Sequence, residues 1–458
     1  MDLIIKNGTI VTASDTFRAD ISIVGGRVAQ IGAELAAGDA RVIDAAGRYV
    51  LPGGVDPHVH LDTPVMGTVT ADDYPSGTIA AACGGTTTVV DFCFQMPGQS
   101  LADALAGWHA RAEGRAAIDY GFHMVVADPT DAAIAELADL PAQGVTSFKL
   151  FMAYKGALMA DDAAIIRVLE QAQRHGALVL VHAENGDAAE LLQRRVIAAG
   201  ISGPKAHLLS RPPRIEADAV ARIITLAELV GTPIYIVHMT CADALEELAR
   251  GRARGAPVVA ETCPHYLNTS EADFDRPGFE AAKYCYSPPP RTPADQERLW
   301  AALANGTLQA VGSDHAPFNF LGQKDLGRDD FTKIPMGAPG VEERMIMLYQ
   351  GVNAGRLSLN RFVELTATAP ARLLGMAPAK GTIAVGADAD LVLWNPDAEL
   401  TLMASVLHQR VDYTVNEGRA VRGLPETVLL RGEVIVERRE FVGRIGAGRF
   451  IRRTRCIA

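Results

Sequence analysis

The sequence is poor in cysteine, and the cysteines it has are not spaced for a metal or a disulfide framework. Only six occur among 458 residues, and no two of them form a Cys-x-x-Cys pair. This usage argues against a zinc finger and against a disulfide-stabilised scaffold. It is typical of a protein from a reducing compartment.

Long apolar runs and an excess of basic charge are also missing. No stretch approaches the ~18 consecutive apolar residues of a membrane-spanning helix. The first residues, MDLIIKNGTIVT, lack the basic and apolar regions of a signal peptide. Lys and Arg total 43 against 54 Asp and Glu, a formal net charge of −11, which argues against a nucleic-acid partner. We therefore expect a soluble cytoplasmic protein with neither a membrane nor a nucleic-acid partner.

Short stretches of roughly alternating apolar residues, punctuated by glycine, occupy both ends of the chain. Examples are LIIKNGTIVT and RVAQIG near the start, and GTIAVGADADLVLW and TVLLRGEVIVE after residue 380. Neither terminal segment is long enough to form a stable hydrophobic core by itself. We predict that residues 1–50 and 377–458 join in one small β domain.

The middle of the chain, residues 51–376, repeats a strand–loop–helix pattern. Strand candidates run from YVLPGGVDPHVH to LQAVGSD, and helical stretches such as ADDAAIIRVLEQAQRHG lie between most of them. Eight parallel strands with intervening helices predict a (β/α)8 barrel. A doubly wound open sheet is the alternative, but no G-x-G-x-x-G follows the first strand, so its usual dinucleotide site is missing.

Polar residues recur where the barrel strands are predicted to end. His58 and His60 close the first strand, and at positions i and i+2 their side chains project to the same face, as two ligands of one metal must. Alone, such a pair is a modest signal. Four more residues stand at the carboxyl ends of later strands, where barrel enzymes place catalytic groups: Lys149, His182, His238 and Asp314. The alternative, unrelated buried polar residues, requires a separate hydrogen-bond partner for each in an apolar strand.

Lys149 is the unusual member because an ammonium only donates hydrogen bonds and cannot bind a cation. Burial and nearby metal charge would lower its pKa and leave a nucleophilic amine. Reaction of this amine with carbon dioxide would give a carbamate, an anion whose two oxygens can bridge two metals. A buried lysine–acid ion pair is the alternative.

With these residues in these positions, the chain resembles the hydantoinase/dihydropyrimidinase family of cyclic amidohydrolases. The resemblance covers essentially the whole length, in blocks such as PGGVDPHVHLD, TSFKLFMAYKG, VHAENGD, ETCPHYL and GSDHAPF. It implies an α/β fold, a TIM-like barrel flanked by a β-sandwich built from both chain termini. It also implies a site with two divalent metals and typically a homotetramer, with a homodimer as the alternative.

The resemblance assigns the site residue by residue. The metal ligands it implies are His58, His60 and Asp314 at the more buried ion, His182 and His238 at the more exposed ion, and Lys149, as N6-carboxylysine, between the two. Zinc is the expected metal, and Mn²⁺, Co²⁺ or Ni²⁺ would also suit such ligands.

Three further residues are implied to bind the substrate. Tyr154 would hydrogen-bond the ring carbonyl, and the backbone of Ser287 would hold the ring amide. Met336 stands where the family commonly has Asn, so the contact there depends on whether backbone or side chain makes it. In the expected reaction hydroxide attacks the carbonyl, and Asp314 carries its proton to the departing ring nitrogen. The product would be an N-carbamoyl amino acid.

The substrate class expected from the resemblance is a small cyclic amide. D-selective hydrolysis of 5-substituted hydantoins, of dihydropyrimidines, or of both is the main prediction, and a dihydropyrimidinase of pyrimidine catabolism is the alternative. Leu61 and Asp62 follow the histidine pair where dihydroorotase-like enzymes carry an arginine, which argues against an acidic ring. Val65, Met66, Phe151, Met152, Leu158 and Met159 are candidates for an apolar pocket or for ordinary core. A non-catalytic protein of the collapsin-response mediator type is a remote alternative, because such relatives have lost metal ligands and here all six positions are filled.

Overall fold

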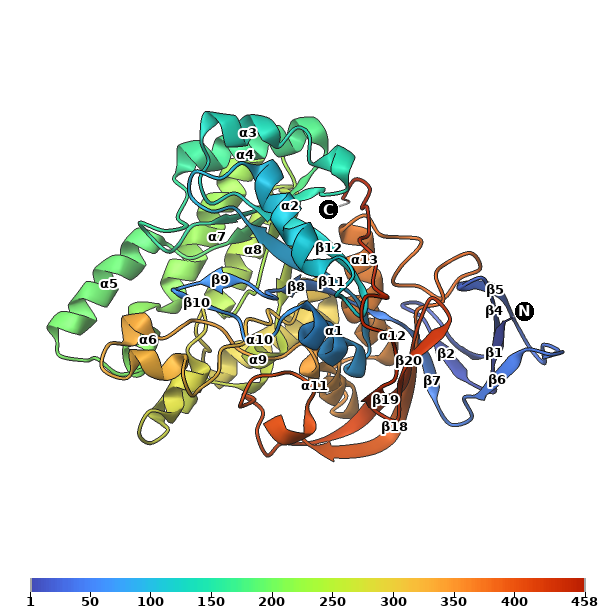
Figure 1. Ribbon diagram of the computed structural model, residues 1–458. Coiled ribbons are helices and arrows are strands. Elements are labelled where there is room, and N and C mark those ends of the chain that lie inside the picture. Colours follow the sequence, from blue (N-terminus) through green and yellow to red (C-terminus); the bar gives the residue numbers. More distant parts are fainter. Residues whose placement is uncertain (1, 457–458) are drawn as a thin grey trace.

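Eight parallel strands form a nearly closed barrel in the computed structural model, which describes residues 2–456. The strands are hydrogen-bonded in chain order, and a parallel bridge between Val59 and His315 brings the last strand segment beside the first. The (β/α)8 barrel predicted from the sequence is therefore confirmed (Figure 1). The barrel strands are β8 (Gly54–Val59), β11 (Thr86–Phe94), β12 (Asp119–Val125), β13 (Ser147–Phe151), β14 (Leu178–His182), β15 (Ile234–Ile236), β16 (Val258–Thr262) and β17 (Ala310–Val311).

The helices that connect these strands follow ordinary capping and packing rules, as α4 (Asp162–His175) illustrates. Asp161 accepts a hydrogen bond from the third helical residue, and Gly176 ends the helix in the left-handed conformation at φ 67°. Ile165, Val168, Leu169 and Ala172 share one face and are buried. The other helices are α1 (Tyr74–Cys83), α2 (Leu101–Ala112), α3 (Asp131–Glu136), α5 (Gly186–Ala198), α6 (Lys205–Ser210), α7 (Pro213–Val230), α8 (Ala242–Ala253), α9 (Pro264–Asn268), α10 (Pro293–Asn305), α11 (Glu343–Asn353), α12 (Leu359–Val363) and α13 (Ala369–Leu373).

Strands from both ends of the chain form two further sheets beside the barrel (Figure 1). Ile5 and Ile21 of the smaller sheet and Ile10 and Leu391 of the larger one share a separate buried cluster, so the two sheets pack as a sandwich. The smaller sheet contains β5 (Arg27–Gly32), β4 (Asp20–Val24), β1 (Leu3–Lys6) and β6 (Arg41–Asp44). The larger sheet contains β21 (Glu440–Phe441), β20 (Glu433–Glu437), β19 (Ala420–Leu430), β18 (Leu391–Thr401), β7 (Tyr49–Pro52), β2 (Thr9–Val11) and β3 (Thr16–Arg18).

The first half of β18 in the larger terminal sheet is buried on both faces, which explains its continuous apolar run. Along β18, Leu391 and Leu393 belong to the sandwich cluster, whereas Val392 and Trp394 belong to the cluster of the barrel. Successive side chains of a strand point to opposite faces, so one strand serves both cores. The β domain is thus attached to the barrel through shared apolar packing.

One strand prediction is wrong. The segment YVLPGGVDPHVH was expected as a single barrel strand, but its first half, β7, pairs with β18 in the larger terminal sheet, and only its second half, β8, enters the barrel. The chain changes sheets at Gly53, where a Cβ would lie 2.1 Å from the Thr87 hydroxyl oxygen. A side chain cannot be accommodated at that approach, so glycine permits the crossing.

A short hairpin, β9 (Pro64–Val65) with β10 (Thr68–Val69), follows the first barrel strand. No helix within residues 2–456 combines the length and the apolar character needed to cross a bilayer.

Candidate metal centre

Three of the predicted ligands meet where the first and last barrel strands end. The Nε2 atom of His58 lies 3.0 Å from Oδ1 of Asp314, and Nε2 of His60 lies 3.3 Å from the same oxygen. The two imidazole nitrogens are 3.3 Å apart. A hydrogen bond of 2.9 Å from the His60 amide to the His315 carbonyl holds the two segments together. These nitrogen and oxygen donors are close enough to bind one cation.

A second pair of predicted ligands lies beside this group. The rings of His182 and His238 are 4.6 Å apart between centroids, and the His238 ring is 5.6 Å from that of His58. Nε2 of His182 is engaged by Glu184 at 2.7 Å, and Arg211 pairs with the same carboxylate at 2.6 Å. Only Nδ1 of His182 therefore remains for a metal, and the carboxylate fixes the ring orientation.

Lys149 is buried on β13 without an acidic partner. Its side chain is 1% exposed, and its ammonium forms no ion pair or hydrogen bond with the residues that the structure describes. The Nζ atom lies 4.8 Å from the ring centre of Phe92 and 5.0 Å from that of Phe151. Burial lowers the pKa of Lys149 to about 8. A nucleophilic amine at neutral pH is therefore accessible, and the alternative of a buried lysine–acid ion pair finds no partner within residues 2–456.

The charges of the first group explain why a cation suits it. Burial opposes protonation of His58, but the carboxylates of Asp314 and Glu261 outweigh it and raise its pKa to about 9. Burial likewise opposes ionisation of Asp314, yet His58, His60 and His238 hold its pKa well below the usual range. Burial lowers the pKa of His60 to about 4, which keeps this imidazole neutral. Asp314 and Glu261 thus supply negative charge beside His58 that a bound cation would balance, and metal binding would compete with protonation of His58.

Several residues that support the first group were not identified from the sequence. Glu261, on β16, accepts from Nδ1 of His58 at 2.6 Å and from the Tyr235 hydroxyl at 2.7 Å, which turns Nε2 of His58 toward Asp314. Oδ1 of Asp56 accepts the amides of His58 and Ser313, at 3.1 and 3.0 Å, and ties the two strand ends together. The sequence feature that could have identified Glu261 is an acidic residue near the end of the apolar segment VVAET.

Gly312 keeps room for the His58–Glu261 pair. A Cβ at this position would lie 2.8 Å from the Cβ of His58 and 2.8 Å from Oε2 of Glu261. Both distances are shorter than real Cβ contacts, so any side chain here would displace one of the two residues.

Three of the predicted functional residues have strained backbone conformations. Tyr154, His238 and Asp314 have φ angles of 65°, 40° and 48°, in the left-handed region that residues other than glycine rarely adopt. Such conformations cost free energy and persist where the surroundings enforce them, often at functional sites. Their coincidence at the barrel mouth supports a functional centre there.

Of the three predicted substrate-binding residues, Tyr154 lies against the histidines. Its ring centre is 5.2 Å from that of His182, and burial raises the pKa of its hydroxyl to about 12, so it remains a hydrogen-bond donor. Ser287 is buried and its hydroxyl has no partner within residues 2–456, whereas Met336 is half-buried against the core. Lys324 links their two loops by donating to the carbonyls of Cys285 and Pro335, both at 2.9 Å.

The apolar residues proposed for a substituent pocket differ in exposure. Phe151 and Met152 are buried, Leu158 packs partly buried against the core, and Met66 is 46% exposed in the turn between β9 and β10. Met66 is therefore available to a ligand, while Phe151 and Met152 also serve the core.

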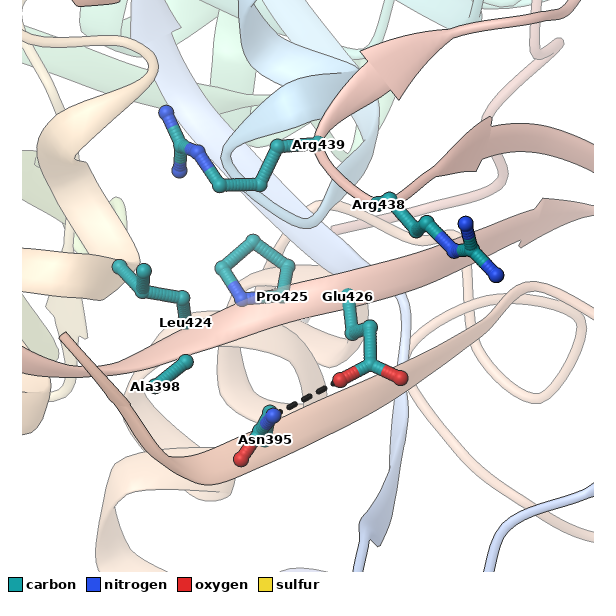
Figure 2. A pocket seen from close by; sticks show the side chains of 7 residues that line it. All are labelled: Asn395, Ala398, Leu424, Pro425, Glu426, Arg438 and Arg439. Carbon is teal, nitrogen blue, oxygen red and sulfur yellow. Dashed lines mark hydrogen bonds between the residues drawn. The ribbon is translucent and has the colours of Figure 1, made fainter. Parts of the chain in front are cut away.

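A cavity of about 340 Å³ lies elsewhere, between β18, β19 and the turn after β20 (Figure 2). Figure 2 shows the guanidinium groups of Arg438 and Arg439 pointing away from one another. Glu426 is already engaged by Asn395 at 2.8 Å and by Arg48 at 3.0 Å. Because its polar groups do not converge, this cavity lacks the features of a catalytic site.

Comparison with known proteins adds to this geometry. The Amidohydrolase family model matches residues 49–434. A D-hydantoinase from Ralstonia pickettii is 54% identical over 453 residues, which cover 99% of this chain and 99% of the relative. A dihydropyrimidinase from Rattus norvegicus is 39% identical over 460 residues, covering 98% of this chain and 88% of the relative. A solved structure of D-hydantoinase, 54% identical and covering 99% of both chains, superposes with a TM-score of 0.98.

Proposed function

The chain belongs to the amidohydrolase family, and we propose that it acts on 5-substituted hydantoins, preferring the D enantiomers, and on dihydropyrimidines. It is a cyclic amidohydrolase, and the products would be N-carbamoyl amino acids. The observation that carries the proposal is the convergence of His58 and His60 on one oxygen of Asp314 at the barrel mouth. The similarity to a D-hydantoinase over 99% of both chains supports the choice of substrate.

The donor set fits a pair of divalent metals, as is general in this family. We propose the six ligands expected from the sequence, with His58, His60 and Asp314 at one ion, His182 and His238 at the other, and Lys149 as a carbamate between them. The burial of Lys149 without an ion pair supports the carbamate, because its lowered pKa favours the neutral amine that reacts with carbon dioxide. Bound there, divalent cations, zinc foremost, would polarise an amide carbonyl and make water a stronger acid.

Two residues of the chain, Tyr154 and Asp314, would carry out the remaining steps of hydrolysis. The Tyr154 hydroxyl, protonated at neutral pH, donates a hydrogen bond to the ring carbonyl and stabilises negative charge on its oxygen. Asp314 accepts the proton of the attacking water as the new C–O bond forms. It delivers that proton to the ring nitrogen as the C–N bond breaks. The new carboxylic acid then loses the second proton of the water to solvent, which leaves a carboxylate and a carbamoylated amine.

The carbamate has its own test, because it requires dissolved carbon dioxide. Apoprotein reloaded with zinc in bicarbonate-containing buffer should regain activity, whereas reloading in carefully degassed buffer should not. Equal recovery in both buffers would exclude the carbamate. We also propose a cytoplasmic homotetramer on the strength of the family resemblance, and sedimentation of the purified protein would measure the assembly.

The substrate is tested by kcat/KM of zinc-loaded protein on dihydrouracil and on each enantiomer of a 5-substituted hydantoin, with the Asp314→Ala variant as the control. A preference for the D-hydantoin would support a substituent pocket in the apolar loops. A preference for dihydrouracil would favour the second candidate, a dihydropyrimidinase, which the similarity to the Rattus norvegicus enzyme supports. No turnover of any of these compounds would refute the proposed function.

A further inference from the structure

We propose that Cys263 and His265, together with Asp314, form an additional cation site that regulates the enzyme. One ligand atom from each of the three residues lies within 4.8 Å of the other two. The occupant would be a zinc ion in excess of the catalytic metals, or a softer cation such as Cd²⁺. Occupation of this site would inhibit hydrolysis.

The two residues that the catalytic centre does not use are firmly placed. Cys263 directly follows β16 and precedes α9, and its side chain is fully buried. His265, on the first turn of α9, is 4% exposed, and its ring lies 4.2 Å from that of Tyr266 and 4.6 Å from that of Tyr286. Both side chains are therefore held beside Asp314 rather than free to move into solvent.

The unsatisfied nitrogen of His265 indicates a missing partner. Its Nε2 atom is buried and forms no hydrogen bond with any residue in the range 2–456. Buried polar atoms are rarely left without a partner because the loss of hydration is not compensated. A cation shared with Cys263 would supply that partner.

The chemistry of the three donors selects the class of cation. Thiolate, imidazole and carboxylate are the ligands of zinc and of softer metals, whereas magnesium and manganese prefer oxygen. Zinc binds sulfur at ~2.3 Å and nitrogen at ~2.0 Å, so small side-chain rotations would bring donors within 4.8 Å of each other onto one ion. The thiol proton of Cys263 would be released to the buffer as the metal–sulfur bond forms.

Inhibition follows from the shared ligand, and this step rests on the proposed function. Asp314 must accept and return a proton during hydrolysis. A cation bound between Asp314, Cys263 and His265 would occupy the carboxylate and prevent that transfer. Oδ1 of Asp314 faces His58 and His60, so the second carboxylate oxygen would serve the added cation while Oδ1 stays with the catalytic ligands. The enzyme would then lose activity while its metal content increases.

The test is a metal count on the purified full-length protein. After equilibration with excess zinc and removal of loosely bound ions, wild type should hold one more zinc per chain than Cys263→Ser or His265→Asn. Cys83→Ser is the matched control, since Cys83 is equally buried but ends α1, just before β11 begins at the opposite end of the barrel. The same zinc content in wild type and both variants would overturn the site.

Two further readouts keep the result clear. The zinc concentration that halves the activity should rise at least about tenfold in Cys263→Ser and stay unchanged in Cys83→Ser. Cadmium added to wild type should give an ultraviolet thiolate-to-metal absorption band that Cys263→Ser lacks. A band of equal intensity in both proteins would count against the site, even if His265→Asn folded poorly. If no cyclic amide were hydrolysed, the proposed function would fail, whereas the zinc difference between wild type and Cys263→Ser would still decide this site.

Discussion

Replacing Gly312 by alanine adds a single methyl group at the most crowded point of the candidate centre. The new Cβ would lie 2.8 Å from the Cβ of His58 and from Oε2 of Glu261, about 0.6 Å inside the shortest ordinary contact. His58 cannot retreat without lengthening its 2.6 Å contact to Glu261 or its 3.0 Å contact to Asp314. We therefore expect the imidazole to move by several tenths of an ångström.

A displacement of this size has a measurable cost. Misplacement of a catalytic group by ~1 Å costs about 100-fold in rate, so we expect kcat/KM to fall by about 10- to 100-fold, or ~1.4–2.7 kcal/mol. Overpacking of a buried site also destabilises the fold by ~1–3 kcal/mol. The assay is kcat/KM on the preferred cyclic amide, with metal content and thermal unfolding measured on the same preparation.

Gly107→Ala is the matched control, because no atom lies within 4 Å of a Cβ added at this exposed position on α2. Alanine inside a helix is favoured over glycine by ~0.5–1 kcal/mol, so this variant should be slightly more stable and fully active. If Gly312→Ala kept its metal and an activity within about threefold of wild type, the reasoning from the His58–Glu261 contact would be refuted.

Three further outcomes are expected. Lys149→Ala and Asp314→Ala should each abolish turnover, and near wild-type kcat/KM for either would refute its assigned role. Glu261→Gln should weaken metal affinity by ~10–100-fold, measured by competition with a chelator, because the carboxylate that orients His58 loses its charge; unchanged affinity would contradict this role. Burial raises the pKa of Glu343 from 4.5 to about 7, so between these pH values the folded state keeps a proton that the unfolded state has released. The free energy of unfolding of the wild type should therefore decrease as pH rises through that window, by up to ~3 kcal/mol. Glu343→Gln should lose this pH dependence when unfolding is measured at about pH 5 and pH 8. Parallel pH profiles of the two proteins would contradict the assignment.

The fold was accessible from the sequence because its signals are local and periodic. Strand-length apolar runs alternate with helical segments, and each such unit must pack against the next one in a parallel sheet. The barrel and the β-sandwich were predicted on this basis and on the family resemblance, and both are confirmed. The crossing at Gly53 was missed, because YVLPGGVDPHVH reads as one continuous apolar strand and only the pairing partners separate its halves.

The residues of the candidate site likewise include some that were predicted from the sequence and some that only the structure identified. The His58–His60 spacing and the positions of His182 and Asp314 at or just after strand ends were visible as a pattern, because strand ends of a parallel barrel face one side. Lys149 was expected at a strand end but lies in the middle of β13. Glu261 and Gly312 were not, because their roles depend on atoms far away along the chain. The orientation of His58, for example, depends on a carboxylate about 200 positions later, 2.6 Å away in the fold.

By itself, the sequence therefore determined the class of fold, the family and the types of chemical group available at the barrel mouth, since these follow from periodicity and from residue identity. Only the tertiary structure decided which nitrogens of His58, His60 and His182 face the centre, which glycine leaves room for His58, and that Lys149 is buried without an ion pair. It also placed the unsatisfied His265 beside Cys263 and Asp314. These properties arise from distances between segments remote in sequence, which depend on how the whole chain packs and not on any local pattern.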